Sequence, residues 1–330
     1  MVKNQSCSKS CKKSLGEKLR LLRILLRKVI QGFAMLLVVS AISFALLSAA
    51  GGDAFSSLRD NPQISDKTIE HLRKVYGLDQ PWPVRYGKWL TGAVRGDLGE
   101  SIFFRVSVAG LVWTRVLNTL LLAAIALFIA VSISLMLSIL CVRYRNKTLD
   151  SFIEALILLT SSTPRIVLAL LALALTVRFS GLAANSQSGS FPSILLASIV
   201  LAAPLISLFL AQAHQELTQA MNEDFVLYAR AKGLSEWAVI RRHALRAALN
   251  PFLTLFGLSL GGLLGGSVIV ETVLGWPGIG SLVVTAVRNR DVPVVMGVVL
   301  VASLAVWFGN TAAEFLQMLN DKRISVTGKS

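Results

Sequence analysis

The strongest constraint on this sequence is a set of apolar stretches that are each long enough to cross a lipid bilayer. A helix needs about 20 apolar residues to cross roughly 30 Å of hydrocarbon. Five stretches contain no Asp, Glu, Lys or Arg: 29–50, 116–142, 191–213, 252–270 and 292–313. A sixth stretch, 152–177, has the required length but includes Glu154 and Arg165. The sequence therefore predicts an all-α polytopic membrane protein with six transmembrane helices.

The composition and the distribution of charge favour a membrane protein with both termini in the cytoplasm. The chain is 54% hydrophobic with a mean hydropathy of +0.65, more than a soluble domain can bury. Its net charge of +15 could indicate nucleic-acid binding, but the basic residues follow the positive-inside rule. The predicted inside segments 1–28, 143–151, 214–250 and 320–330 carry nine, three, five and three Lys and Arg. The outside segment 51–115 carries nine, but segments of that length cross membranes largely regardless of charge. We expect an N-in/C-in topology and no nucleic-acid partner.

The spans divide the chain into a predicted series of tails, loops and helices. In order, these are a basic cytoplasmic tail with an interfacial helix (1–28), the first span (29–50), a periplasmic segment (51–115), the second span (116–142), the third (152–177), the fourth (191–213), a cytoplasmic loop (214–250), the fifth span (251–274), a periplasmic loop (275–291), the sixth span (292–319) and a cytoplasmic tail (320–330). The periplasmic segment is expected to form a small cap. Its short helix begins at Ser65, carries Ile69, Leu72 and Val75 on one face, and ends at Gly77.

The loop 214–250 is too polar to span a membrane and too periodic to be a slack linker. Leu217, Met221, Phe225 and Tyr228 recur at helical spacing, Gly233 interrupts the pattern, and a second helix begins near Ser235. Two short helices that meet at a glycine form a projecting elbow. Such an elbow could insert a helix end into a groove of a partner, or lie as an amphipathic hairpin on the inner leaflet, and the pattern alone leaves both open.

The fifth span is rich in glycine. Its small residues occur at spacings of four: Gly257, Gly261, Gly262, Gly265 and Gly266. Because helices in lipid associate through close packing, this ladder favours a helix contact within the bundle or with a partner subunit. The alternative is that these glycines line a transport pathway.

Arg165 stands in the middle of the third span, directly after Thr163 and Pro164. A cation there costs about 2.5–3.5 kcal/mol on insertion scales if it faces lipid, so it must be sheltered. Either it faces a watery pathway, or the span boundaries shift so that its side chain reaches the inner surface. Glu154 is not an obvious partner.

The sequence contains no pattern typical of an enzyme or of a metal site. Cys7 and Cys11 lie in the tail and Cys141 lies at the inner end of a span, so neither a disulfide framework nor a metal centre is predicted. The terminal Gly328 to Ser330 imitates the end of a phosphate-binding loop, but Arg323 stands where its first glycine belongs. We expect that this chain is not an enzyme.

Several separated motifs resemble one known family. They are Glu223-Asp224-Phe225-Val226-Leu227-Tyr228-Ala229-Arg230-Ala231-Lys232-Gly233-Leu234, Arg242 to Arg246, Asn250-Pro251, Gly77 to Pro81, Arg95 to Gly99, Glu271 to Val273, Trp276 to Gly280 and Arg290 to Pro293. This set resembles the ABC importer permease subunits of the dipeptide, oligopeptide and nickel family, over residues 29 to 324. The general permease signature has Glu-Ala-Ala where this chain has Leu227-Tyr228-Ala229, a departure that is usual in this branch.

The resemblance implies a type I ABC importer permease fold with its core over about 110–320. It also implies that the first helix of the loop docks on a separate ATPase subunit. The positions that match this coupling element are Asp224, Phe225, Tyr228, Ala229, Arg230, Ala231, Lys232, Gly233 and Leu234. The implied partners are a second homologous permease, two ATPase subunits and an external solute-binding protein, in a bacterial cytoplasmic membrane. ATP and Mg²⁺ would bind the ATPases, and this chain would bind no cofactor.

The resemblance also implies a substrate class. Peptides are the default cargo of this family, with nickel or small oligosaccharides as alternatives. An ion-coupled secondary transporter is a competing function from a different class, and it would need charged relays in several spans. Among the spans of this sequence, only Arg165 stands out as such a group.

Overall fold

The computed structural model describes residues 3–50, 66–144, 146–180 and 191–320. Within these ranges the chain is almost entirely helical, and its extended pairing is limited to an isolated bridge between Glu100 and Ser107. The helices are α1 (Lys3–Ala49), α2 (Asp66–Val75), α3 (Trp82–Val94), α4 (Val108–Tyr144), α5 (Lys147–Ser162), α6 (Arg165–Ser180), α7 (Phe191–Met221), α8 (Asp224–Ala231), α9 (Glu236–Val239), the π-helical turn η3 (Ile240–Ala244), α10 (Leu245–Leu274), α11 (Ile279–Arg288) and α12 (Val292–Asn320).

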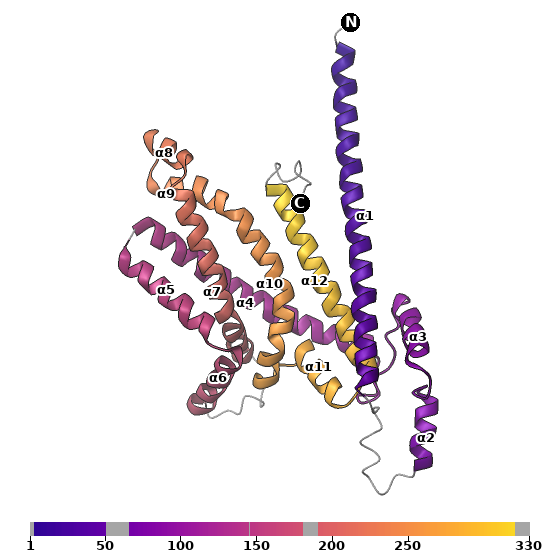
Figure 1. The fold of residues 1–330 in the computed structure, drawn as a ribbon. Helices are drawn as coiled ribbons and strands as arrows, with labels where there is room; N and C mark the ends of the chain where they lie inside the picture. The colour runs from indigo at the N-terminus through magenta and orange to yellow at the C-terminus, as the bar shows by residue number, and fades with distance from the viewer. Residues whose placement is uncertain (1–2, 51–65, 145, 181–190, 321–330) are drawn as a thin grey trace.

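Five helices in the described ranges are long and apolar enough to cross a membrane. Their apolar segments are Leu26–Ala49, Val108–Tyr144, Pro192–Met221, Pro251–Leu274 and Val292–Phe315. The N-terminus, α8 and α9, and the last turns of α12 lie at one end of the bundle, whereas α2, α3 and α11 lie at the other (Figure 1). We refer to these as the elbow end and the cap end.

The third predicted span differs from expectation. Instead of one helix over 152–177, the structure has α5 and α6, which meet at an angle of 95°. Thr163 between them is extended, with φ −88° and ψ 118°, because the residue before a proline avoids the helical region. Pro164 also lacks the N–H that would continue the helix. The expectation of one continuous helix is therefore wrong, and the pair supplies a sixth span only if both halves act together.

The N-terminal tail also differs from expectation. The predicted interfacial helix within 1–28 is not a separate element, because α1 runs unbroken from Lys3 to Ala49. This stretch is rich in leucine, lysine and arginine, which favour helix, and it contains no proline. α1 packs against α12, where Lys28 forms an ion pair with Glu314 at 2.6 Å and its carbonyl accepts a hydrogen bond from Trp307. Figure 1 shows α1 extending past the other helices at the elbow end.

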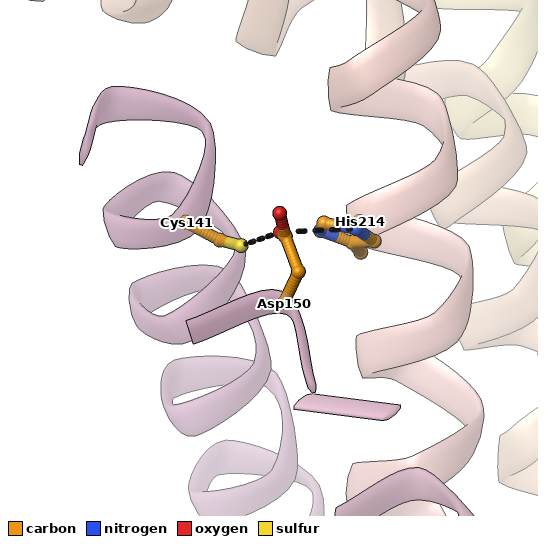
Figure 2. A group of neighbouring side chains, drawn as sticks. All are labelled: Cys141, Asp150 and His214. Carbon is orange, nitrogen blue, oxygen red and sulfur yellow. Dashed lines mark hydrogen bonds and ion pairs between the residues drawn. The ribbon is translucent and has the colours of Figure 1, made fainter. Parts of the chain in front are cut away.

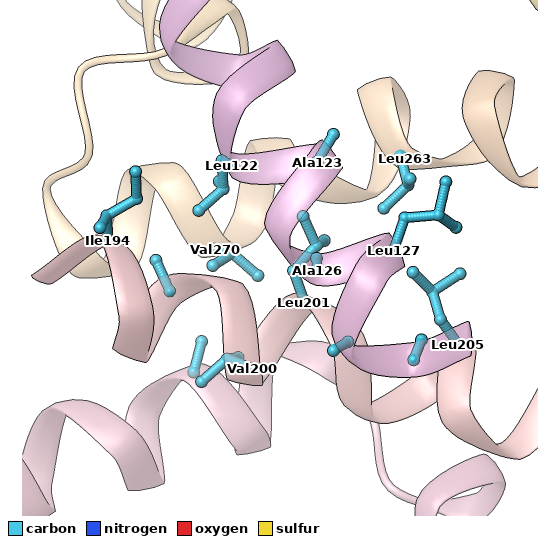
Figure 3. Close-up of a cluster of buried hydrophobic side chains, with 14 of the residues drawn as sticks. Leu122, Ala123, Ala126, Leu127, Ile194, Val200, Leu201, Leu205, Leu263 and Val270 are labelled. Carbon is cyan, nitrogen blue, oxygen red and sulfur yellow. The ribbon is translucent and has the colours of Figure 1, made fainter. Parts of the chain in front are cut away.

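The main core lies where α4, α7 and α10 pack together (Figure 3). α4 contributes small residues such as Ala123 and Ala126, so that the larger Leu201 and Val270 can approach its backbone. Phe209 is fully buried and packs on Phe252 with ring centroids 5.0 Å apart. This core holds the three helices that carry the elbow and the cap end in fixed relative positions.

The cap end forms a second core between α4, α11 and α12. It contains Leu98, Val108, Val112, Val116, Ile279, Leu282, Ala286, Val294, Val295 and Val298. α2 ends at Val75, and the predicted stop Gly77 follows in the turn, with a φ of +63° and an N–H that donates to the Lys74 carbonyl. Ile69 is buried, but Val75 is 65% exposed, so these two do not share one buried face as expected. The predicted cap residue Ser65 and the Leu72 side chain lie outside the described residues.

Candidate functional site: the elbow between α7 and α10

The elbow is built from the end of α7, α8, α9 and η3. α7 continues to Met221, two turns beyond the predicted end of the fourth span, and α8 begins after a break of two residues. Gly233 ends α8 with φ +80°, a conformation that glycine adopts without strain. Ser235 then caps α9 through its hydroxyl, which accepts a hydrogen bond from Ala238 N–H at 3.4 Å. The chain therefore turns back sharply at the predicted glycine and enters α10.

The elbow has a hydrophobic core of its own. Val226 and Ala229 of α8 are buried against Leu217 and Met221 of α7 and against Ile240 of η3. Ala229 was predicted as a coupling residue, but its side chain is only 5% exposed and faces this core. Because α8 is held by packing, the elbow is a stiff projection and not a loose loop.

An ion pair closes the elbow across its glycine turn. Arg230 Nε lies 2.8 Å from Glu236 Oε1, and Arg230 Nη2 lies 3.2 Å from Glu236 Oε2. This two-point geometry is the strong form of an arginine–carboxylate pair. Because the Glu236 side chain is half exposed, the ion pair nevertheless contributes little to the stability of the fold. Arg230 is therefore engaged within the elbow, where it joins α8 to α9.

The outer face of the elbow is apolar and exposed. Leu227 and Tyr228 are 67% and 70% exposed, and Trp237 is 45% exposed. Phe225 and Leu234 are also exposed, as are the predicted residues Asp224, Ala231 and Lys232. The four-residue pattern Leu217, Met221, Phe225 and Tyr228 is thus not one face: the chain breaks between α7 and α8, so the first two are buried and the last two are exposed.

Trp237 is a part of this face that the sequence pattern did not single out. Its ring lies 5.7 Å from the Arg143 guanidinium at the end of α4, a distance typical of a cation–π contact. Phe225 approaches His243 of η3 with centroids 6.5 Å apart. Trp237 could have been recognised in the sequence as a large aromatic residue in a polar loop, two residues after Ser235. These contacts connect the exposed face to α4 and η3.

The predicted glycine ladder of α10 divides into two groups. A side chain at Gly257 would overlap Ala313 of α12, and one at Gly261 would lie 3.3 Å from Val306. At Gly266 it would overlap the Arg165 guanidinium. A side chain at Gly262 or Gly265 would meet nothing within 4 Å. Part of the ladder thus serves close packing inside the chain, and the role of the other two glycines stays a prediction.

Arg165 lies at the start of α6, directly after the break, and is half buried. Its guanidinium lies over the α10 backbone at Gly266, which provides shelter through helix packing. Arg165 is therefore the first residue of a helix and not the middle of a straight one, as expected. Its role in a pathway stays a prediction.

The cap end contains two buried carboxylates that the sequence analysis did not assign. Glu271, at the end of α10, accepts hydrogen bonds from Thr119 Oγ1 at 2.7 Å, Gly280 N–H at 2.7 Å and Ser281 N–H at 3.0 Å. Asp291 accepts from Ser101 Oγ at 2.5 Å and from Phe103 N–H at 3.1 Å. Both carboxylates are fully buried.

These carboxylates join segments that are far apart in the sequence. Glu271 ties α10 to α4 and α11, and Asp291 ties the start of α12 to the turn before α4. A side chain at Gly278 would overlap the Glu271 carboxylate, which explains the glycine there. The motif residues between α10 and α12 thus form a buried hydrogen-bonded network, which we call the structural lock.

Comparison with known proteins agrees with this architecture. The family described as "Binding-protein-dependent transport system inner membrane component" matches residues 130–326, and its N-terminal region matches residues 21–104. One solved structure, an inward-facing conformation of the MetNI methionine ABC transporter, aligns with a TM-score of 0.53 over 64% of this chain and 96% of that chain. Its sequence identity is 17%, so it supports the fold alone.

Relatives of known designation match almost the whole chain. A putative peptide permease protein of Brucella suis biovar 1 (strain 1330) is 35% identical over 93% of this chain and 100% of its own length. The oligopeptide transport system permease protein AppB of Bacillus subtilis (strain 168) is 32% identical over 91% and 98%. The glutathione transport system permease protein GsiC of Salmonella paratyphi A is 32% identical over 86% and 92%. This chain therefore belongs to the binding-protein-dependent transport system inner membrane components, the permease subunits of ABC importers.

Proposed function

We propose that this chain is the permease subunit of an ATP-driven importer of di- and oligopeptides, and that its elbow docks on the ATPase. The observation that carries the proposal is the apolar face at the tip of a stiff elbow: Phe225, Leu227, Tyr228, Leu234 and Trp237. Exposed aromatic and aliphatic side chains on a projecting helix are typical of helix-in-groove contacts.

The internal packing of the elbow favours docking over a hairpin that lies on the inner leaflet. A leaflet-bound helix turns its main apolar face to lipid. In α8 the buried side, with Val226 and Ala229, is already occupied by the elbow's own core. Leu227 and Tyr228 remain exposed, and Figure 1 shows α8 at the tip of the elbow, beyond the adjoining ends of α7 and α10. A groove in a soluble partner fits that shape.

The stiffness of the elbow is what the proposed mechanism needs. ATP binding to the partner subunits would favour one arrangement of those subunits, and the elbow would carry that preference to α7 and α10. Because α7 and α10 are also packed on α4, a displacement at α8 would reach the whole core. The spans would then switch between inward and outward openings.

The remaining parts of the proposal rest on the family. The complex would contain a second homologous permease, two ATPase subunits that bind ATP and Mg²⁺, and an external solute-binding protein. This chain would bind no cofactor itself and would lie in a bacterial cytoplasmic membrane with both termini inside. Relatives designated as peptide, oligopeptide and glutathione permeases support peptides as the cargo.

Replacement of Ala231 by Trp tests the docking. Ala231 is exposed at the end of α8, so the larger side chain can be accommodated in the free chain but would obstruct the groove of an ATPase. We expect at least a tenfold loss of stimulated ATP hydrolysis by the assembled complex, with membrane insertion and thermal unfolding unchanged. Val94→Trp is the matched control, since Val94 is 76% exposed in the cap. Normal stimulation in Ala231→Trp would refute the docking assignment.

The cargo needs a separate experiment. The external binding protein encoded with this permease would be heated with di- and oligopeptides, nickel and small oligosaccharides. A ligand that binds only the folded state raises the unfolding temperature, and the increase grows with the logarithm of the ligand concentration relative to its Kd. Protection by peptides alone is the expected result, and protection by nickel or a sugar alone would contradict a peptide cargo while leaving the docking assignment intact.

A further inference from the structure

Three side chains with metal-binding atoms meet near the elbow end, outside the docking face. Figure 2 shows Asp150, from the first turn of α5, between Cys141 of α4 and His214 of α7. Their ligand atoms all lie within 4.8 Å of one another. The Cys141 thiol donates a hydrogen bond to Asp150 Oδ1, and His214 Nε2 lies 3.9 Å from the same oxygen. They come from three different helices, which is why sequence spacing did not predict a metal centre.

The surroundings of this cluster are partly apolar. Cys141 is 2% exposed and packs with the buried Ile153 and Leu210. Asp150 and His214 are partly exposed, which leaves a path from solvent. His214 Nδ1 is buried and has no hydrogen-bond partner among the described residues. The imidazole is therefore incompletely satisfied by its present neighbours.

We propose that Cys141, Asp150 and His214 bind one divalent cation of the Zn²⁺ class. Thiolate, imidazole and carboxylate are the donors that this ion prefers, at about 2.0–2.3 Å from the metal in a tetrahedral arrangement. Donor atoms around such an ion stand roughly 3.5 Å apart. Displacements of about 1 Å, through small side-chain rotations, would therefore bring the three ligand atoms to coordination distance from one ion. Three protein ligands leave the fourth position for water.

Charge balance supports a dication at this position. On binding, the Cys141 thiol loses its proton to solvent, and one metal–sulfur bond replaces the hydrogen bond to Asp150. The thiolate and the Asp150 carboxylate together carry two negative charges, which one dication neutralises. A neutral metal cluster costs less free energy to bury in partly apolar surroundings than a charged one.

The position of the site links it to the elbow. His214 lies on α7 just before Leu217, which is fully buried in the elbow core, and Cys141 lies beside Val142, which packs on the same core. A bound ion would fasten α5 to both helices, in addition to their apolar contacts. The inference does not depend on the ATPase docking or on the cargo, and it can be tested without either.

The test is metal binding by the full-length chain purified in detergent. The parent protein would carry Cys7→Ser and Cys11→Ser, so that the tail thiols cannot contribute. We expect it to bind one Co²⁺ per chain with a thiolate-to-cobalt charge-transfer band, and Zn²⁺ to displace the Co²⁺. Cys141→Ser should abolish the band, and His214→Gln and Asp150→Asn should weaken binding at least tenfold.

His243→Gln is the matched control, because His243 lies in η3 of the elbow and outside the cluster. It should bind the metal with unchanged affinity. Zn²⁺ should also raise the unfolding temperature of the parent and of His243→Gln, but not that of His214→Gln. If Asp150→Asn does not fold, His214→Gln decides. Absence of the band in the parent, or equal affinity in His214→Gln, would overturn the proposal and leave a Cys141–Asp150 hydrogen bond beside His214, without a cation.

Discussion

The elbow end and the cap end of the bundle differ in what they expose and what they bury. At the elbow, apolar side chains such as Leu227 and Tyr228 remain on the surface, and a half-exposed ion pair closes the turn. At the cap end, Glu271 and Asp291 are fully buried and joined to segments distant in the sequence. The difference supports the proposed docking of the elbow on a partner. The cap end is instead held together by its own buried hydrogen bonds.

The energetic cost of change should follow this division. A buried carboxylate that accepts several hydrogen bonds cannot be removed without leaving buried donors unsatisfied. An exposed apolar side chain can be removed with little effect on the free chain, because solvent already reaches it. Variants at the cap end should therefore lower the stability of the isolated chain, and variants on the elbow face should lower binding.

The largest effect on stability is expected for Glu271→Ala. The substitution leaves the Thr119 hydroxyl and the Gly280 and Ser281 amides without their acceptor inside the protein. We expect a loss of about 3–5 kcal/mol in the free energy of unfolding, measured by denaturation in detergent micelles. Glu314→Ala, which removes the partly exposed ion pair with Lys28, is the control and should cost about 1 kcal/mol or less. Equal losses of unfolding free energy in the two variants would contradict a stabilising role for the buried Glu271 network.

The second effect concerns the glycine ladder. Gly257→Leu would force α10 away from Ala313 on α12, and overpacking of this kind costs about 1–3 kcal/mol. Gly262→Leu is the matched variant, since a side chain there meets open space. Denaturation of the isolated chain should separate the two variants clearly. If Gly262→Leu is equally unstable, the two groups of glycines do not differ as the structure indicates.

The same pair of variants sharpens the role of the open glycines. If Gly262 and Gly265 face a second permease, Gly262→Leu should reduce assembly of the complex while the free chain stays intact. Size-exclusion chromatography of the co-expressed subunits measures this. Normal assembly with altered transport would instead favour a pathway lining for these positions.

Gly233→Ala should have a smaller effect, confined to the elbow. Its φ of +80° places a Cβ in a region that costs about 1 kcal/mol or slightly more for residues other than glycine. We expect faster proteolysis between α8 and α9 and a loss of only about 1 kcal/mol in the free energy of global unfolding. Gly233→Asn is the milder control, because asparagine tolerates this conformation better. Equal cleavage of Ala, Asn and Gly forms would show that the turn does not depend on its backbone angle.

The sequence was sufficient for the features that depend on local composition. Five spans follow from apolar length, the interruption at Gly233 from a residue that tolerates positive φ, and the helix that begins near Ser235 from the renewed helical pattern. Composition could not determine the 95° break at Pro164, since proline also occurs inside unbroken helices here, at Pro204 and Pro251. The tertiary neighbours decide between these outcomes.

The candidate site was only partly predictable for the same reason. The elbow could be located from its periodicity, but which side of α8 is free depends on α7, which ends at Met221 and buries Ala229. The lock at Glu271 needs donors from α4 and α11, and the cluster at Asp150 needs side chains from α4 and α7. Contacts between distant segments leave no mark on the local periodicity of one sequence.

The smallest effect is expected for the ion pair between Arg230 and Glu236. Since both side chains reach solvent, Arg230→Ala should change the free energy of unfolding by less than about 1 kcal/mol. A double-mutant cycle with Glu236→Ala should give a coupling energy of a few tenths of a kcal/mol that decreases with added salt. A coupling above about 2 kcal/mol would mean that the elbow depends on an electrostatic lock like that of the cap end. The division between a binding end and a locked end would then have to be abandoned.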